Sequence, residues 1–383
     1  MQGRTPRLVY LITEDWFFVS HFMNRARAAK AAGYDVQIVT RRSTGGVHDG
    51  RLSEFGLTEF EMSRNSLNPV GLAAEALRLR RIYRAMAPDI VHHVGLKAII
   101  VGGLAAFGNR SLHVVNAPVG MGFIFTSPSL KMRLLRGPVR MLIGMMLRAP
   151  NAVTIVENSE DRAEFISRFG LDPTSTELIE GAGVDPDVYV DRPRDANPDR
   201  PPVVMLAARM LREKGVGEFV EAARLLKGRG LKAQFVLVGA PDPVNPGAIP
   251  EETLKAWQAE GIVSWAGHSN DMPAMLTWAD IVCLPSYREG LPKVLLEAAS
   301  AGCALVTTDV PGCRAIVAHE KTGLLVKPRD VASLADGLAR MIEDPALRAS
   351  LAQAGRERVL ARFSDAVVNQ KTLAVYRNLA GRL

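Results

Sequence analysis

The sequence has 383 residues, of which 48% are hydrophobic and 23% charged, and its net charge is +7. This composition is that of a soluble globular chain, and the length is too great for one hydrophobic core of ordinary size, so we expect two domains. Residues 1–150 hold 20 Lys or Arg against 9 Asp or Glu (+11), whereas residues 151–383 hold 27 against 31 (−4). The basic first half indicates a negatively charged partner, either a membrane surface or nucleic acid.

Short runs rich in β-branched residues alternate with helical patterns through the first half of the chain. The predicted strands are residues 7–13, 35–40, 89–94, 112–117 and 152–157, and the predicted helices include 21–33 and 71–88. This alternation favours a doubly wound parallel sheet. The opening stretch is interrupted by Glu14 and Asp15, so we interpret it as a buried first strand and not as a signal segment.

A basic and apolar segment, residues 129–150, follows the fourth predicted strand. It contains no acid and five cations, Lys131, Arg133, Arg136, Arg140 and Arg148. Gly137 and Pro138 predict a break into two short helices, and the longest charge-free apolar run, residues 141–147, is too short to span a bilayer. The segment either lies on a membrane surface or packs on the core as an ordinary amphipathic helix, and the sequence favours neither.

Nucleic acid is the weaker of the two anionic partners. The basic residues are not interleaved with aromatic ones, and the sequence contains no nucleic-acid-binding signature, so we expect no nucleic-acid partner. The three cysteines, Cys283, Cys303 and Cys313, form no CxxC pair, which favours reduced thiols in a cytoplasmic protein. The seven histidines lack the spacing of zinc ligands, so we expect no metal site.

The strand and helix alternation starts again after residue 202. The predicted strands are residues 202–208, 233–239, 261–267, 280–286 and 304–309, and the proline-rich residues 190–202 predict a linker before them. We therefore expect an α/β protein with two doubly wound domains, residues 1–190 and 203–365. Two such domains leave a cleft at the carboxyl ends of their strands, where ligands bind.

Two glutamates, Glu289 and Glu297, stand eight residues apart around Pro292. A helix that begins near this proline places Glu289 just before it and Glu297 about one and a half turns inside, up to about 12 Å apart. A glycosidase pair needs carboxyl groups about 5 to 9.5 Å apart, so this spacing suits the two ends of an elongated ligand better. The alternative is a solvated loop glutamate and a helical pair of Lys293 with Glu297.

Two cations follow the first predicted strand of the second domain. Arg209 stands at the end of that strand, and Lys214 stands just before a helix that begins near Gly215. A guanidinium and an ammonium beside a helix N-terminus suit a diphosphate, although a solvated basic turn is the alternative. The glutamates follow the fourth strand of the same domain, so both groups are expected at one edge of one sheet.

These motifs together resemble a known family. Arg209 and Lys214 in ARMLREKGV, the stretch SYREGLPKVLLEAASAGCALVTTDVPGCRAIV and the stretch KTGLLV are similar to the retaining glycosyltransferases of family 4, which have the GT-B architecture of two facing Rossmann-like domains with an interdomain cleft. The resemblance implies that the final helix, residues 366–383, returns to the first domain. It also implies a reaction that needs no metal or other cofactor.

The resemblance assigns the donor site to the second domain. It implies that Arg209 and Lys214 bind the donor diphosphate, that Glu289 contacts the transferred sugar, and that Glu297 holds the ribose hydroxyls. Arg209, Lys214 and Glu289 are the implied catalytic residues. Gly290 and Leu291 complete the implied donor-binding set.

The first domain departs from the family pattern. TEDWFFVSHF stands where many members have a glycine-rich loop, so we expect Asp15 and Trp16 to shape the acceptor side. Val119 stands about where many members carry a histidine. The stretch GMGFIFTS resembles members that build bacterial surface glycans on a polyprenyl diphosphate-linked sugar, so Asn116, Gly120 and Gly122 border the expected acceptor pocket, unless the glycines form a purely structural turn.

The implied function is transfer of a hexose or N-acetylhexosamine from a nucleoside diphosphate sugar, with uridine the usual base, to a polyprenyl diphosphate-linked saccharide. A lipid-linked acceptor accounts for the charge asymmetry, because a basic first half would bind peripherally to the anionic cytoplasmic face of an inner membrane. Two alternatives are a non-hydrolysing nucleotide-sugar epimerase and a non-catalytic nucleotide-sugar-binding protein.

Overall fold

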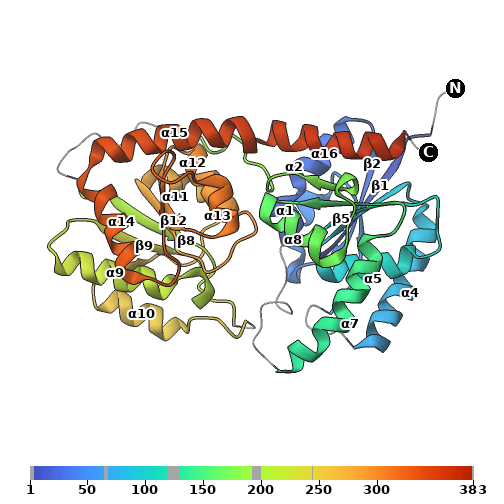
Figure 1. The fold of residues 1–383 in the computed structure, drawn as a ribbon, viewed down its shortest axis with the longest axis horizontal. Coiled ribbons are helices and arrows are strands. Elements are labelled where there is room, and N and C mark those ends of the chain that lie inside the picture. Colours follow the sequence, from blue (N-terminus) through green and yellow to red (C-terminus); the bar gives the residue numbers. More distant parts are fainter. Residues whose placement is uncertain (1–3, 64–67, 120–129, 192–199, 244, 382–383) are drawn as a thin grey trace. The chain divides into compact units, whose positions relative to one another are not determined.

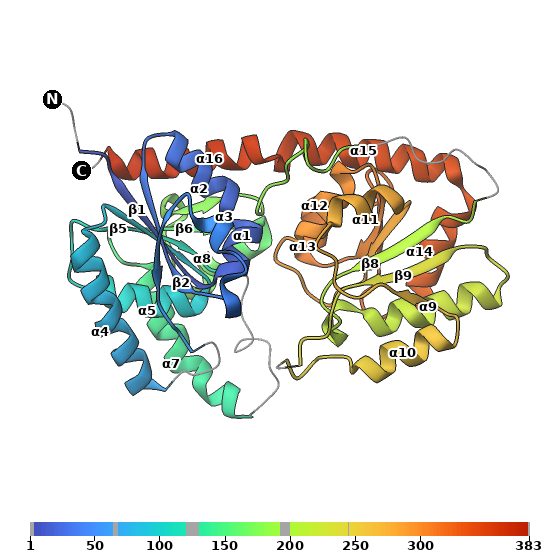
Figure 2. The ribbon, with the colours of Figure 1, turned by 180° about the vertical axis from the view of Figure 1, so that it is seen from behind.

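The computed structural model describes residues 4–63, 68–119, 130–191, 200–243 and 245–381. The chain divides into two compact units, Met1–Glu180 with Val368–Leu383, and Gly181–Val367. Each unit is a parallel sheet with helices on both faces (Figures 1 and 2). Most of the predicted linker, residues 192–199, lies outside the described residues.

The first unit has a seven-stranded sheet in the order β3-β2-β1-β4-β5-β6-β7, and every described pair is parallel. Its strands are β1 (Arg7–Glu14), β2 (Asp35–Arg41), β3 (Gly56–Glu59), β4 (Ile90–Val94), β5 (His113–Ala117), β6 (Ala152–Val156) and β7 (Thr176–Leu178). The five strands predicted for this half are confirmed. The two strands that the sequence pattern missed, β3 and β7, are short and close the two edges of the sheet.

Two separate cores cover the two faces of this sheet, because alternate residues of β1 point in opposite directions. Val9 and Leu11 pack with helices α4 (Pro69–Met86), α5 (Leu96–Ala106), α7 (Leu130–Leu147) and α8 (Ser159–Phe169). Leu8 and Tyr10 pack with helices α1 (Asp15–His21), α2 (Met23–Ala31) and α16 (Asp365–Ala380), and near α3 (Asp49–Leu52).

Helix α7 differs from the sequence prediction at its proline. The predicted break at Gly137 and Pro138 is wrong, because the helix runs through Pro138 without interruption. A proline inside a helix removes one backbone hydrogen bond. The residues that follow it, Val139, Ile143 and Met146, are buried against the core, and this packing holds the helix together beyond the proline.

Helix α16 follows the second unit in sequence but completes the core of the first. Its Tyr376 hydroxyl lies 2.8 Å from the Tyr10 hydroxyl and 2.6 Å from Nδ1 of His92, both on the central strands. Burial raises the pKa of Tyr10 to about 12 and lowers the pKa of His92 well below its usual value, so this network is neutral. The last helix is therefore fixed to β1 and β4 by buried hydrogen bonds.

The second unit has a six-stranded parallel sheet in the order β10-β9-β8-β11-β12-β13. Its strands are β8 (Val203–Ala207), β9 (Gln234–Val238), β10 (Ser264–Trp265), β11 (Ile281–Leu284), β12 (Ala304–Thr308) and β13 (Leu324–Val326). Its helices are α9 (Val216–Gly228), α10 (Glu251–Ala259), α11 (Met272–Trp278), α12 (Lys293–Ser300), α13 (Pro311–Ile316), α14 (Val331–Glu343) and α15 (Pro345–Phe363). The five predicted strands are confirmed.

In the described part of the chain, every helix is too short or too polar to cross a lipid bilayer. The three cysteines are buried, and none of them forms a disulfide bond within the residues that the structure describes. Burial raises the pKa of Cys313 to about 12, so this thiol stays protonated near neutral pH.

Candidate active site

The order of strands in the second unit fixes where its ligand site must lie. The sheet is built outward in both directions from β8 and β11, which are neighbours although β9 and β10 separate them in sequence. Ligands of open α/β sheets bind beyond the carboxyl ends of the strands at this switch point. Arg209 follows β8 and Glu289 follows β11, so the structure places both predicted residues at the switch point.

The loop after β8 is held in shape by a glycine that no other residue could replace. A short 3₁₀ turn, Arg212–Lys214, leads into Gly215, which has φ of +71° and caps α9. A Cβ on Gly215 would lie 2.1 Å from the carbonyl oxygen of Pro285, at the end of β11. The loop after β8 and the loop after β11 are therefore in direct backbone contact.

A second contact fixes the same two loops. The N–H of Tyr287 donates to the carbonyl oxygen of Glu213 at 2.9 Å, and the Tyr287 hydroxyl donates to Glu218 at 2.5 Å. Burial and the Glu218 carboxylate raise the pKa of Tyr287 to about 12. The predicted site is thus built on loops that are bonded to each other.

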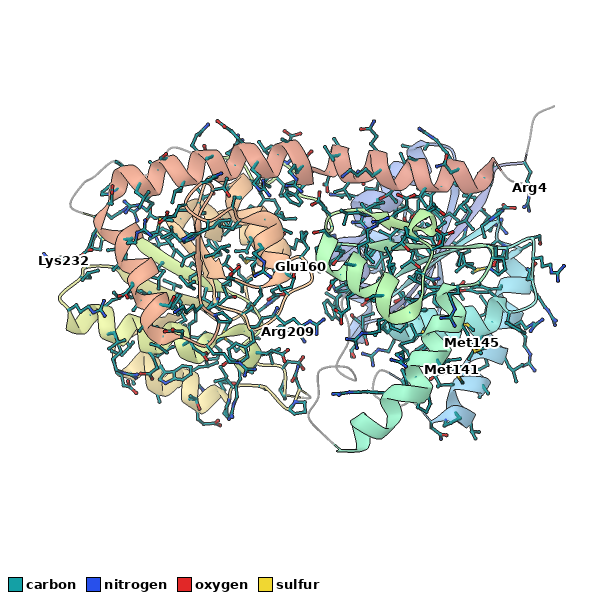
Figure 3. The ribbon with its side chains drawn as sticks, in the orientation of Figure 1. Arg4, Met141, Met145, Glu160, Arg209 and Lys232 are labelled. Carbon is teal, nitrogen blue, oxygen red and sulfur yellow. The ribbon has the colours of Figure 1, made fainter. Side chains whose placement is uncertain are left out.

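Both predicted cations are paired with carboxylates. Nζ of Lys214 lies 2.5 Å from Oε1 of Glu289, and the two side chains are 21% and 10% exposed. Arg209, labelled in Figure 3, lies 2.9 Å from Asp242, which follows β9. Asp242 was missed by sequence reasoning, since nothing in its surroundings marks it as a partner of a residue 33 positions away. An anionic ligand that reached these cations would have to exchange with the two carboxylates.

The second glutamate lies inside α12, as predicted, and is nearly buried. Glu297 accepts a hydrogen bond from the Tyr189 hydroxyl at 2.7 Å and pairs with Lys293 at 2.8 Å, so the helical pair that was the alternative interpretation is present. Burial and the Glu297 carboxylate raise the pKa of Tyr189. Tyr189 was also missed, because it lies 108 residues from its partner.

The loop that carries Glu289 rests on the start of α13. A Cβ on Gly312 would lie 2.3 Å from the carbonyl oxygen of Gly290, so only glycine permits this approach. Leu291 is 9% exposed and packs in the core beneath. The Thr308 hydroxyl donates to the carbonyl oxygen of Ser286 at 2.5 Å, just before the loop. Gly290 and Leu291 thus anchor the predicted donor loop.

In the first unit, the predicted acceptor residues Asp15 and Trp16 begin α1 directly after β1. Asp15 is fully buried and accepts hydrogen bonds from the N–H and the hydroxyl of Ser43 at 2.7 and 2.5 Å. Its side chain therefore holds the chain after β2 in place. Trp16 is 38% exposed, so its indole is available to a ligand.

The end of β5 combines a buried amide with a strained backbone. Asn116 is fully buried, and its Oδ1 lies 3.1 Å from Nδ1 of His93, whose pKa burial lowers to about 4. Val119 has φ of +49°, a conformation that is costly for a β-branched residue and that clusters at functional sites. Gly120 and Gly122 lie outside the described residues.

Glu157, directly after β6, is a further acidic group that sequence reasoning missed. Burial raises its pKa to about 7, an effect that Arg25 partly opposes and Asp161 reinforces. No sequence pattern marks it, because its environment depends on α2, which is distant in sequence. A carboxyl group that titrates near neutral pH at the carboxyl end of a sheet is typical of a functional site.

Across the described ranges, no three His, Cys, Asp or Glu side chains gather closely enough to hold an ion.

Two family models match the chain. The one described as Glycosyl transferase 4-like matches residues 7–157, and the one described as Glycosyl transferases group 1 matches residues 189–358. The chain belongs to the glycosyltransferases that these models define, and its pair of Rossmann-like α/β domains is the GT-B architecture. The predicted family and fold class are confirmed.

Among curated relatives, the chain is 29% identical over 338 residues to N,N'-diacetylbacillosaminyl-diphospho-undecaprenol alpha-1,3-N-acetylgalactosaminyltransferase of Campylobacter jejuni, which covers 85% of this chain and 87% of that protein. Among solved structures, sucrose-phosphate synthase from Thermosynechococcus elongatus superposes with a TM-score of 0.83 at 20% identity, covering 99% of this chain and 100% of that one. Anabaena Alr3699/HepE in complex with UDP superposes with a TM-score of 0.77 at 19% identity, covering 97% and 100%. At these identities the structural likeness establishes the fold alone.

Proposed function

We propose that this glycosyltransferase is a retaining enzyme that moves a hexose or N-acetylhexosamine from a UDP-linked sugar to a polyprenyl diphosphate-linked saccharide in bacterial surface-glycan assembly. The observation that carries the proposal is the pair of cations, Arg209 and Lys214, at the switch point of the second sheet, with Glu289 bonded to one of them. The acceptor class is supported by the Campylobacter relative, whose name specifies a diphospho-undecaprenol-linked acceptor and an N-acetylgalactosaminyl group.

The cations have a defined role in the proposed reaction. Cleavage of the bond between sugar and diphosphate leaves negative charge on the departing diphosphate, so Arg209 and Lys214 stabilise the transition state more than the bound donor. Lys214 exchanges its contact with Glu289 for the diphosphate, and the released carboxylate positions the transferred sugar. A diphosphate oxygen accepts the proton of the attacking hydroxyl on the same face of the sugar.

The ribose end of the donor is assigned to Glu297. A carboxylate that already accepts a hydrogen bond from Tyr189 and pairs with Lys293 has a fixed orientation, which suits bidentate binding of two vicinal hydroxyls. The positive charges of Arg209 and Lys214 stabilise the negative charge of the departing diphosphate, so we expect turnover without an added metal. Peripheral binding at the cytoplasmic face of the inner membrane completes the proposal.

The test is a matrix of donors and acceptors with the purified full chain. UDP-, GDP- and dTDP-linked sugars are each incubated with and without a polyprenyl diphosphate-linked saccharide, in the presence and absence of EDTA. We expect an α-linked product from a UDP-sugar, unaffected by EDTA, with its anomeric configuration read by NMR. A C2-epimer formed from donor alone would establish the epimerase instead, and tight donor binding without turnover on any acceptor would establish a non-catalytic binding protein.

A further inference from the structure

Helices α4, α5 and α7 lie, with α8, on one face of the first sheet (Figures 1 and 2). Helices α4 and α7 both pack against α5. Their inner sides are apolar and buried, with Leu79 and Tyr83 on α4 and Ile143 and Met146 on α7. The outer sides of α4 and α7 face away from this core.

Helices α4, α5 and α7 belong to the most basic part of the chain. Residues 69–150 hold 11 Lys or Arg and 2 Asp or Glu, which accounts for +9 of the +11 in the first 150 residues. Both acids are already neutralised within the fold. Glu75 pairs with Lys97 at 2.8 Å in a nearly buried contact, and Asp89 pairs with Arg4. Among the described residues between 69 and 150, the exposed charges that remain are therefore positive.

Helix α4 carries several arginines, although it lies outside residues 129–150, the segment whose sequence suggested a membrane surface. Arg81 and Arg84 are exposed, Arg80 is half-buried, and Arg140 is exposed on α7. None of these four has an ion-pair partner among the residues that the structure describes. Arginines elsewhere commonly do: pairs are formed by Arg7 with Asp35, Arg42 with Asp49, Arg200 with Asp280, Arg224 with Glu260 and Arg314 with Asp309.

Large apolar side chains are exposed on the same helices. Leu77 on α4 is 62% exposed, and Met141 and Met145 on α7 are 65% and 46% exposed. The two methionines lie one helical turn apart (Figure 3). A surface that combines unpaired cations with exposed apolar side chains is typical of a helix that lies at the boundary between lipid headgroups and acyl chains.

We infer that the exposed side of α4 and α7 is the surface by which this protein docks on an anionic lipid bilayer. Unpaired arginines attract acidic headgroups, while Leu77, Met141 and Met145 enter the apolar boundary beneath them. A second copy of the chain does not fit this surface, because two layers of the same positive charge would repel each other. The inference rests on the proposed lipid-linked acceptor for its biological purpose, although vesicle binding is measurable without it.

The test is sedimentation of the full chain with vesicles of phosphatidylglycerol mixed with phosphatidylcholine, and with vesicles of phosphatidylcholine alone. We expect binding to the anionic vesicles that weakens as salt is added, because salt screens the attraction. The variant R80Q/R81Q/R84Q should bind these vesicles roughly a hundredfold more weakly, since each cation near the surface contributes on the order of a factor of five. Glutamine preserves helix propensity at these positions.

A matched control removes the same charge from the second unit. Lys232, Lys321 and Lys327 are exposed, and the variant K232Q/K321Q/K327Q should bind vesicles as the wild type does. The variant M141S/M145S should lose the part of the binding that resists salt. Equal vesicle binding by wild type and R80Q/R81Q/R84Q would overturn the inference, and so would tighter binding of wild type to duplex DNA than to vesicles at the same ionic strength.

Donor binding separates this inference from the proposed function. Calorimetry with UDP should give the same affinity for R80Q/R81Q/R84Q and wild type, because the donor site is proposed in the second unit. Unchanged circular dichroism and an unchanged thermal unfolding curve then show that the first unit, which carries the substitutions, is folded. If that variant were unfolded, the single changes Arg84→Gln and Met141→Ser would take its place, each with a several-fold loss of vesicle binding. Failure of glycosyl transfer together with intact, arginine-dependent vesicle binding would remove the proposed function and leave the docking surface in place.

Discussion

At the carboxyl edge of its sheet the second unit holds Arg209, Lys214 and Glu289 in exposed or half-buried ion pairs. The first unit holds buried groups there, among them the neutral Asn116 and His93 and the carboxyl of Glu157, whose pKa is raised to about 7. The two sheets are wound in the same order around their central strands. Strand order thus decides where a site lies, and side chains decide the charge of the group that fits there.

The largest expected effect follows from removing a charge of the second unit. Lys214→Ala should lower kcat/KM for the donor by roughly a hundred- to a thousandfold, because a positioned donor to the developing charge is lost and Glu289 is left without its partner. Steady-state kinetics with the full chain measure this. Lys232→Ala is the control, since Lys232 is exposed and stands just before β9, at the amino edge of the sheet and away from the carboxyl edge that carries the site. A Lys214→Ala enzyme with wild-type kinetics would remove the cation from the mechanism.

A second prediction uses two glycines at the start of one helix. Gly215→Ala should destabilise the second unit by about 2–3 kcal/mol and abolish donor binding, because the left-handed φ and the contact with Pro285 both exclude a Cβ. Gly217→Ala, two residues along, meets nothing within 4 Å and should leave stability unchanged or raise it by up to about 1 kcal/mol. Thermal unfolding with and without UDP distinguishes them, and equal behaviour of the two variants would contradict the loop geometry.

The third prediction concerns the first unit and pH. Because the folded pKa of Glu157 is raised from 4.5 to about 7, folding favours the protonated carboxyl, and this stability is complete below about pH 4.5 and lost as the pH rises through about 7. At pH 8, Glu157→Gln should therefore have a free energy of unfolding about 1–2 kcal/mol greater than that of the wild type, and should unfold at a higher temperature. The difference should shrink toward pH 5. Calorimetric scans across this range measure it. A difference that did not change with pH would show that Glu157 carries no raised pKa.

The smallest expected effect is an increase in the affinity for the donor. Asp242→Asn should tighten donor binding by about two- to fivefold, because Arg209 no longer has to leave a carboxylate, and an exposed ion pair is worth on the order of 0–1 kcal/mol. Isothermal titration with UDP measures this change. Asp336→Asn, which disrupts the comparable surface pair with Arg229, is the control and should not alter the affinity. Weaker binding by Asp242→Asn would instead make Asp242 a ligand of the donor.

Much of the fold was predictable, because buried parallel strands have short sequences rich in β-branched residues. The positions of Arg209, Lys214, Glu289 and Glu297 along the elements followed from the same pattern, since parallel strands end at one edge. The short edge strands β3 and β7 were missed because a few residues on a sheet edge carry too little apolar periodicity to be recognised.

The rest of the site could not be predicted, because it depends on contacts between distant parts of the chain. Tyr189 reaches Glu297 across 108 residues, and Asp242 reaches Arg209 from the next strand. Pro138 is a case where a local signal gave the wrong prediction. The proline predicted a break, but the helix continues because Val139 and Ile143 are buried against the core. The strained backbone of Val119 had no sequence signal, because valine is ordinarily extended.

Because the last helix completes the first unit, this protein cannot finish folding in the order in which it is synthesised. Val368, Val375, Tyr376 and Leu379 fill the core against β1 and β4, and they leave the ribosome only after all of Gly181–Val367 has emerged. Until then, part of one apolar sheet face stays uncovered in the nascent chain, which is the condition under which chaperones bind and aggregation begins. Truncation of the C-terminus would make that temporary exposure permanent.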